Sequence, residues 1–335
     1  MSSAPTADEI ARDATWLVQA LDPGQGMARL VAMDRDSYRD AGFLDDRMLQ
    51  APIDAQIVSW TLIEELLGED MRSDARWIFH IGHVGSTLVS RLLGEIDGVL
   101  AVREPRLLRD LALTPAEVRR RYVEPVPRLM SRTFGEGETA CVKATSFVSE
   151  IAPELVPTGQ RALFMFARPR NYVASILAGE NSTQELRILA GKRSQRLNGR
   201  GIYLPAQNDA QLAAAAWAAE MTALEAAADV MADRTIAWTD FDALLRDVEP
   251  ELGRIAGFFG FEADPGRLST IASGPLMNRY SKAPEYDYSP SLRRDLISET
   301  LEQHGRDIDG GLAMLKSAAE RSPLLERALA RAEES

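Results

Sequence analysis

Five short apolar runs that alternate with helical patterns constrain the fold of this chain more than any other feature of its sequence. Each run has the length of a strand, and the segments between the runs place apolar residues at helical spacing. Strands that alternate with helices predict right-handed crossovers and a mostly parallel sheet with helices on both faces. We therefore predict a three-layer α/β fold with about five strands. The runs are WIFHI (77–81), GVLAV (98–102), ACVKA (140–144), ALFMFA (162–167) and TIAW (235–238).

The rest of the pattern divides the chain into a core and two attachments. We predict an N-terminal helical extension over 1–75, an α/β core over 76–250, and a C-terminal helical segment and loop over 251–335 that completes the same domain. Within the extension, apolar spacing predicts amphipathic helices over 7–20 and 55–68. The basic stretch GKRSQRLNGRG (191–201) predicts a mobile surface loop or a lid over an anionic ligand. Helices inside the core are expected at 87–95, 114–133, 171–190 and 209–232.

Composition excludes several classes of protein. The chain has 335 residues, 45% apolar and 26% charged, as in a soluble globular protein. Its net charge of −12 disfavours a surface that binds nucleic acid or anionic membranes, so we expect no nucleic-acid partner. One cysteine and three histidines leave too few ligands for a structural zinc site. No run reaches the roughly 18 apolar residues of a membrane span and the N-terminus lacks a signal-peptide pattern, so we expect a cytoplasmic protein.

The turn after the first run has the composition of an anion site. HIGHVGST (80–87) places two glycines between a buried strand and a helix, so that backbone N–H groups converge near the positive end of the helix dipole. The turn keeps Gly85 and Thr87 of the nucleotide-binding pattern G-x-x-x-x-G-K-[ST], but Ser86 replaces the lysine and His80 replaces the first glycine. The candidate anion-binding residues are Gly82, His83, Val84, Gly85, Ser86 and Thr87.

A second strand and turn, LFMFARPRNYVASIL (163–177), completes a recognisable pair of motifs. Arg168 and Ser175 stand seven residues apart, and a guanidinium is suited to binding a phosphate. Together the two segments resemble the sulfotransferase family, which has a P-loop-type fold. The resemblance implies that the first turn binds the 5′-phosphosulfate of 3′-phosphoadenosine-5′-phosphosulfate, and that Arg168 and Ser175 bind its 3′-phosphate. The loop over 276–290 offers Lys282 as a further cation above the nucleotide.

The pattern is most similar to the tyrosylprotein branch of that family and its bacterial relatives. This similarity implies that Glu104, in GVLAVREPRLL, is the catalytic base, and that Lys143 lies near the transferred sulfonate. His83 stands where many family members carry lysine or arginine, and its ring N–H can still act as a donor to the 5′ end. A sulfonate carries less charge than a terminal phosphate, so no metal is expected. The acceptor is a hydroxyl or an amine of unknown identity.

Other interpretations of the same residues remain open. A phosphotransferase using ATP and magnesium would need an acid for the metal, for which Asp240 is a candidate. A non-catalytic nucleotide-binding protein would keep the fold without the chemistry. Glu104 is flanked by Arg103 and Arg106, so it could be a salt-bridged acid before a helix, and Lys143 could be an ordinary surface lysine.

Overall fold

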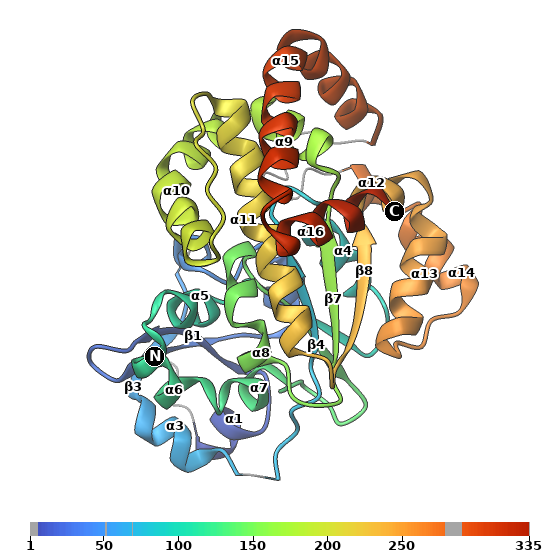
Figure 1. Ribbon diagram of the computed structural model, residues 1–335. Helices are drawn as coiled ribbons and strands as arrows, with labels where there is room; N and C mark the ends of the chain where they lie inside the picture. The colour runs from blue at the N-terminus through green and yellow to red at the C-terminus, as the bar shows by residue number, and fades with distance from the viewer. Residues whose placement is uncertain (1–5, 51, 69, 279–289, 335) are drawn as a thin grey trace.

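The computed structural model describes residues 6–50, 52–68, 70–278 and 290–334. A five-stranded parallel sheet lies between layers of helices, which is the α/β architecture predicted from the sequence (Figure 1). All five apolar runs form strands. Their bounds are β4 Arg76–His80, β5 Val99–Arg103, β6 Thr139–Lys143, β7 Arg161–Phe166 and β8 Thr235–Asp240.

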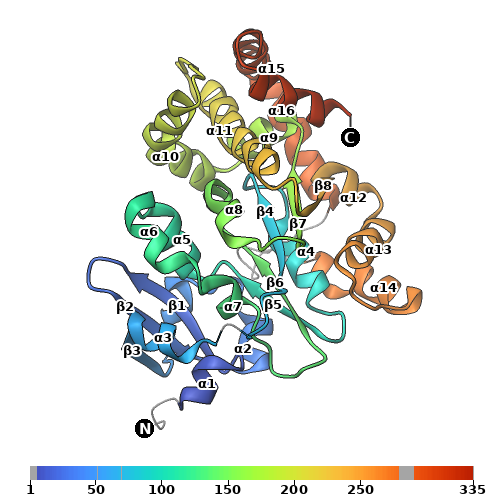
Figure 2. The same cartoon turned by 60° about the horizontal axis from the view of Figure 1, so that its bottom comes forward.

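The order of the strands places the first of them at the centre of the sheet. The order is β5-β6-β4-β7-β8, and every neighbouring pair is parallel (Figure 2). Ile78 of β4 lies opposite Lys143 on one side and Leu163 on the other. From β4 the chain crosses to β5 and β6 on one side of the central strand, and later forms β7 and β8 on its other side. In open parallel sheets, ligands bind outside the carboxyl ends of the strands where the order reverses, which here is the end of β4.

Helices cover both faces of this sheet. On one face, α4 (Ser86–Leu93) packs on β5, β6 and α13 (Val248–Phe259). On the other face, α11 (Asp209–Val230) packs against β4, α9 (Pro169–Leu177) and η2 (Ser146–Ile151). Right-handed crossovers that run in opposite directions along a sheet place their helices on opposite faces of it. The remaining elements of this region are α5 Arg106–Leu113, α6 Ala116–Val123, α7 Val126–Met130, α8 Ala152–Leu155, α10 Glu180–Gly199, α12 Phe241–Arg246, α14 Pro265–Ala272, η3 Pro275–Asn278, α15 Pro290–Ala319 and α16 Pro323–Glu333.

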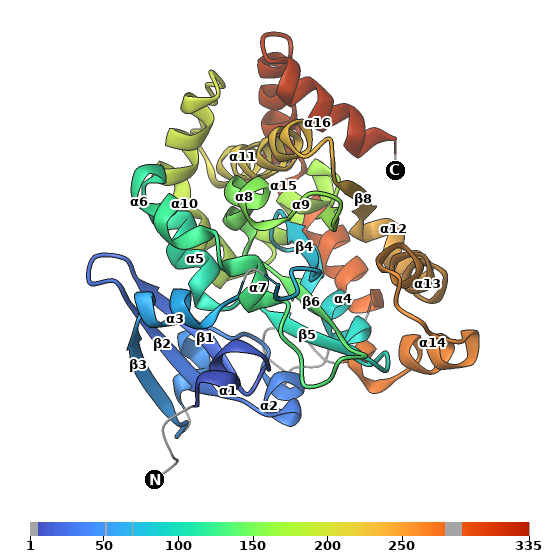
Figure 3. The ribbon, with the colours of Figure 1, turned by 90° about the horizontal axis from the view of Figure 1, so that it is seen from below.

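The N-terminal segment differs from the sequence-based expectation. The helix predicted over 7–20 is wrong beyond Ala11, because the chain from Trp16 forms the first strand of a three-stranded antiparallel sheet with the order β1-β2-β3 (Figure 3). The helix predicted over 55–68 is confirmed only from Trp60 to Leu66, because Ala55–Ser59 forms the third strand of that sheet. Its first strand packs against α5. The elements are α1 Ala7–Ala11, β1 Trp16–Asp22, β2 Met27–Ala32, α2 Arg35–Asp40, η1 Asp46–Gln50, β3 Ala55–Ser59 and α3 Trp60–Leu66.

The physical reason is burial on both faces of the first strand. Residues 16–21 are all buried and all but Gln19 are apolar, so their pattern satisfies a helical spacing as well as a strand. The segment DPGQG (22–26) that follows distinguishes the strand from the helix. Asp22 accepts hydrogen bonds from the N–H groups of Gly24 and Gln25 at 3.0 and 3.1 Å, and Gly26 has a φ of 65°. These are signals of a hairpin rather than of a helix end.

The loop or lid predicted over 191–201 is also wrong. Helix α10 continues through Gly199, because arginines three and four residues apart near its end reach two acids of neighbouring elements, of which Glu220 is buried. Arg196 pairs with Glu150 and Glu220, and Arg200 pairs with Glu150. The helix predicted over 114–133 is divided near Pro125 into α6 and α7, and the one over 171–190 is divided at 178–179 into α9 and α10.

The C-terminal segment contains helices as expected, in α13 to α16. Within the loop predicted over 276–290, η3 ends at Asn278, and Lys282 lies outside the described residues. Across the four described ranges, no helix is both long and apolar enough to cross a membrane.

Candidate active site

The carboxyl edge of the parallel sheet brings the candidate residues into one region. The β4–α4 turn occupies the centre of this edge, since β4 is the central strand. On one side of β4, Glu104 follows β5 and Lys143 is the last residue of β6. On the other side, Arg168 follows β7. Residues from four strand ends, spread over more than eighty positions of sequence, therefore lie along one edge of the sheet.

The β4–α4 turn has the backbone geometry of an anion site. Gly82, His83 and Gly85 have φ angles of 80°, 54° and 58°, all left-handed. Successive residues of this kind turn their N–H groups into a concavity, and the first N–H groups of α4 have no partner within the helix. A Cβ on Gly85 would lie 2.0 Å from the ring of Phe241, so glycine is required at this position. The turn can hold a phosphate or sulfonate group.

His80 fixes this turn to the neighbouring strand. Its Nδ1 accepts a hydrogen bond from the Gly82 N–H at 3.0 Å, so the proton of the neutral ring is assigned to Nε2. Nε2 lies 2.9 Å from the carbonyl oxygen of Ala144, to which it donates. The ring is buried, and both of its nitrogens have protein partners. His80 is thus a core residue that connects the anion-binding turn with the end of β6.

Glu104 and Lys143 form a buried ion pair. Lys143 Nζ donates to Glu104 Oε1, and Thr145 Oγ1 donates to Glu104 Oε2 at 3.4 Å. The Glu104 N–H also donates to the Lys143 carbonyl at 2.7 Å. Lys143 is 1% exposed, so it is not a surface lysine, and its charge depends on Glu104 for compensation. The structure thus places an acid and a cation together beside the β4–α4 turn.

Backbone strain is concentrated on two of the candidate residues. Among the described residues, His83 and Glu104 are the only ones other than glycine with a positive φ, at 54° and 52°. A left-handed conformation costs a residue with a side chain about 1–2 kcal/mol. Such strain persists where the surrounding structure imposes it, and it occurs preferentially at ligand-binding and catalytic sites.

Arg168 and Ser175 lie at the start and in the body of α9. Arg168 is 45% exposed in its side chain, and its Nε lies 3.7 Å from Oδ2 of Asp240. Burial, and next the charge of Asp242, raise the pKa of Asp240, whose Oδ1 accepts the Asp242 N–H at 3.2 Å. Ser175 Oγ donates to the carbonyl oxygen of Tyr172 at 2.8 Å.

Tyr172 connects the two motifs. Its hydroxyl donates to the Ile81 carbonyl at 3.3 Å, and its ring meets that of His83 edge to face, with centroids 6.4 Å apart. Strands β4 and β7 are also direct neighbours. The β4–α4 turn and the start of α9 are therefore neighbours in the structure, joined through Tyr172.

One part of the site could not be found from the sequence. Leu44, in the N-terminal segment, donates its N–H to the Arg103 carbonyl at 2.7 Å and accepts the Arg106 N–H at 3.3 Å. The chain around Leu44 thus binds the backbone on both sides of Glu104. It also places the ring of Phe43 with its centroid 5.5 Å from Lys143 Nζ. These residues fall between two periodic patterns and match no motif, so only the tertiary structure shows them.

Metal ligands do not gather in the part of the chain that the structure describes. Over residues 6–50, 52–68, 70–278 and 290–334, no group of three or more His, Cys, Asp or Glu side chains could hold a metal ion. Asp240, the acid considered for magnesium, caps α12 (Phe241–Arg246) and faces Arg168 instead.

Comparison with known proteins gives similarity in structure but none in sequence. No protein-family model matches the chain, and no curated protein matches it. Three solved structures that resemble it in fold are sulfotransferases. One is the sulfotransferase domain from the curacin biosynthetic pathway, at 12% identity over 70% of this chain and 99% of that domain, with a TM-score of 0.41. A second is mouse sulfotransferase SULT7A1 complexed with PAP, at 10% identity over 77% of this chain and 89% of the mouse chain, with a TM-score of 0.40.

A third structure has a still lower TM-score. The sulfotransferase domain of the Synechococcus PCC 7002 olefin synthase is 15% identical over 70% of this chain and 97% of that domain, with a TM-score of 0.36. Likeness at these values is loose and carries no information about the site residues of this chain.

Proposed function

We propose that the protein transfers a sulfonate group from 3′-phosphoadenosine-5′-phosphosulfate to a hydroxyl or amine acceptor. One observation carries the proposal: the strained turn Gly82–Gly85 lies between the Glu104–Lys143 pair on one side and Arg168 on the other. An acid, a cation and two anion sites are the groups that such a transfer needs. The acid after β5 is also the feature that the tyrosylprotein branch would require.

The residues fit a donor with two anionic ends. The converging N–H groups of the β4–α4 turn, with those of Ser86 and Thr87 at the start of α4, suit the 5′-phosphosulfate. Arg168 suits the 3′-phosphate because its guanidinium side chain is 45% exposed and follows β7 at the same edge of the sheet. The Ser175 hydroxyl lies on the same helix and can add a donor.

In the reaction, the acceptor oxygen or nitrogen forms a bond to sulfur while the bond from sulfur to the 5′-phosphate oxygen breaks. Glu104 takes the proton from the acceptor, a role worth typically 10²- to 10⁴-fold in rate. Lys143 and the N–H groups of the turn neutralise charge on the sulfonate and on the departing phosphate oxygen. His83, held in the turn beside Tyr172, offers a further ring N–H to the 5′ end. On this proposal the reaction needs no metal.

Binding of the desulfated donor distinguishes this proposal from its alternatives. Adenosine 3′,5′-bisphosphate at 100 times its dissociation constant should stabilise the protein by about 2.7 kcal/mol, which a thermal-shift assay detects. ATP with magnesium should stabilise it far less. Stabilisation by ATP and magnesium alone would indicate a phosphotransferase. Stabilisation by the bisphosphate without turnover on any acceptor would indicate a non-catalytic nucleotide-binding protein.

A further inference from the structure

Arg47 lies beside the carboxylate that we propose as the base. Its Nη2 is 3.8 Å from Glu104 Oε2, and its side chain is 50% exposed. Asp45 holds the guanidinium from one edge, with Nε at 2.8 Å from Oδ1 and Nη2 at 2.6 Å from Oδ2. Burial alone would raise the pKa of Asp45, but the hydrogen bonds from Arg47 outweigh it and hold that pKa below its usual value. The orientation of the guanidinium is therefore set by a charged partner.

An aromatic ring fixes the same guanidinium from its face. The central carbon of Arg47 lies 3.4 Å from the centroid of the Phe43 ring, within the range of a cation–π contact. Lys143 Nζ lies 5.5 Å from the same centroid. Phe43 thus contacts both Lys143, the cation of the proposed reacting centre, and Arg47.

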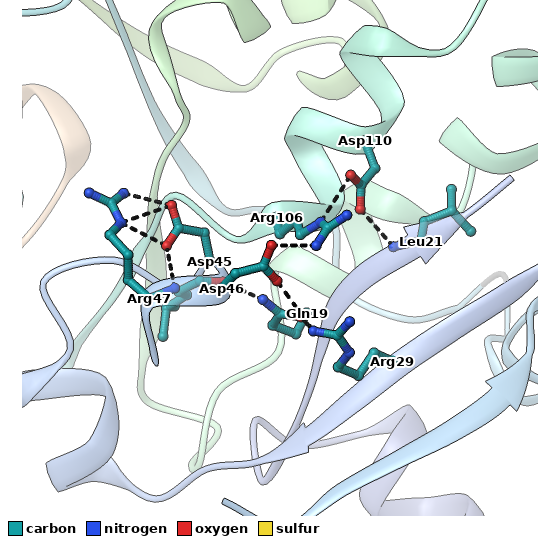
Figure 4. Close-up of polar contacts among 9 residues, drawn as sticks. Gln19, Leu21, Arg29, Asp45, Asp46, Arg47, Arg106 and Asp110 are labelled. Atoms are coloured by element: carbon teal, nitrogen blue, oxygen red, sulfur yellow. Dashed lines mark hydrogen bonds and ion pairs between the residues drawn. The ribbon is translucent and has the colours of Figure 1, made fainter. Parts of the chain in front are cut away.

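A network of charges anchors the segment that carries both residues (Figure 4). Asp46 pairs with Arg106 at the start of α5 and with Arg29 Nη1 of β2, the latter at 3.3 Å. Arg106 Nε also donates to Asp110 at 3.2 Å, and Asp110 accepts the Leu21 N–H of β1 at 3.0 Å. The 43–47 segment is consequently held by the N-terminal sheet and by the helix that follows Glu104.

The remaining donors of Arg47 point to a ligand. A guanidinium carries five N–H donors, and Asp45 accepts from Nε and once from Nη2. Among the described residues, Nη1 of Arg47 has no hydrogen-bond partner, and the side chain is half exposed. A guanidinium that is held in a fixed orientation and exposed to solvent binds carboxylates and phosphates in preference to neutral groups.

We propose that Arg47 binds an anionic group of the acceptor, so that the substrate of this site is a hydroxyl or amine compound carrying a carboxylate, phosphate or sulfate. This inference rests on the proposed sulfonate transfer. The reacting atom must lie about 3 Å from Glu104, and the anion about 3 Å from Arg47, so the two groups of the acceptor are separated by about 10 Å or less.

The test compares acceptors that differ only in charge. The probes are 4-hydroxybenzoate and 3-hydroxybenzoate, each with its neutral amide, assayed with the full chain and the phosphosulfate donor. We expect kcat/KM to favour at least one acid over its amide by roughly 10- to 100-fold, the value of a hydrogen bond to a charged group. In Arg47→Gln this ratio should fall to near one. Arg109→Gln, on the exposed side of α5, removes an equal charge and should keep the ratio.

Binding without turnover gives a second readout. Calorimetric titration of the same acids and amides into the protein saturated with adenosine 3′,5′-bisphosphate should show the same preference for the acid, lost in Arg47→Gln. Equal use and equal binding of acid and amide by the unmodified protein would overturn the inference. So would a preference for the acid that persists in Arg47→Gln. If adenosine 3′,5′-bisphosphate itself fails to bind, the proposed function fails, and the inference with it.

Discussion

The side chains of Glu104 and Lys143 meet in a buried ion pair at the ends of the neighbouring strands β5 and β6. Each residue has an ordinary explanation when considered alone: an acid before a helix and a lysine at a strand end. Their pairing argues against these explanations, because the free-energy cost of desolvating two charges offsets much of what a buried ion pair contributes to stability. On the proposed function, the pair supplies the base and the cation of the transfer.

Glu104→Gln should abolish most of the turnover while leaving the donor site intact. The amide cannot take a proton from the acceptor, so we expect kcat to fall by about 10²- to 10⁴-fold. The dissociation constant for adenosine 3′,5′-bisphosphate, measured by calorimetry, should stay within a few-fold. Glu117→Gln, an exposed position of α6, serves as the control for the loss of one negative charge. Full activity in Glu104→Gln would contradict the assignment.

The ion pair should also be visible in the stability of the protein. Lys143→Met leaves the buried carboxylate of Glu104 without the cation that donates to it, and removal of one partner of such a pair costs about 3–5 kcal/mol. The double variant Glu104→Gln with Lys143→Met should lose less free energy of unfolding than the sum of the two single variants. Urea unfolding of all four proteins measures this coupling. Additive losses would show that the two side chains do not depend on each other.

Gly85→Ala should damage the anion-binding turn. The added methyl group would meet the ring of Phe241 at 2.0 Å, and the φ of 58° is itself unfavourable for alanine. We expect a loss of at least about 2 kcal/mol in unfolding free energy, together with weaker binding of adenosine 3′,5′-bisphosphate. Gly137→Ala is the matched control, because a Cβ there has no atom within 4 Å. Equal behaviour of the two variants would argue against the geometry of the turn.

Arg168→Lys should weaken recognition of the 3′-phosphate selectively. Lysine keeps the charge but loses the two-pronged geometry, so we expect affinity for adenosine 3′,5′-bisphosphate to fall about tenfold or more. Affinity for adenosine 5′-monophosphate, which lacks the 3′-phosphate, should change far less. The ratio of the two dissociation constants is the quantity to measure. A parallel loss for both ligands would place Arg168 away from the 3′ end.

Asp240→Asn should stabilise the protein at neutral pH. Burial raises the pKa of Asp240 in the folded state, so its ionised form is disfavoured by folding. Stability contributed by this group is therefore lost as the pH rises from the usual aspartate range, about 4, through the raised folded pKa. Asparagine removes this penalty and still caps α12. The gain in melting temperature should be present at pH 7 and shrink as the pH is lowered toward 4, and a gain that is constant with pH would contradict the cause.

Local patterns in the sequence were sufficient for the core of the fold and for the residues on its strand ends. The five apolar runs all form strands of one parallel sheet, since such strands are buried on both faces and stand out from their flanking turns. The carboxyl ends of parallel strands share one edge. For this reason, motifs that follow β4, β5, β6 and β7 could be assigned to a common region before any coordinates were known.

Only the tertiary structure decided what lies against that edge. Burial of Trp16 to Leu21 on both faces makes a strand of a segment whose spacing also fits a helix, and the N-terminal sheet that results carries Phe43 and Arg47 to Glu104. The contact between Arg168 and Asp240 joins residues more than seventy positions apart. Such pairings depend on how separate elements pack, and the periodicity of a single segment records only which of its faces is apolar.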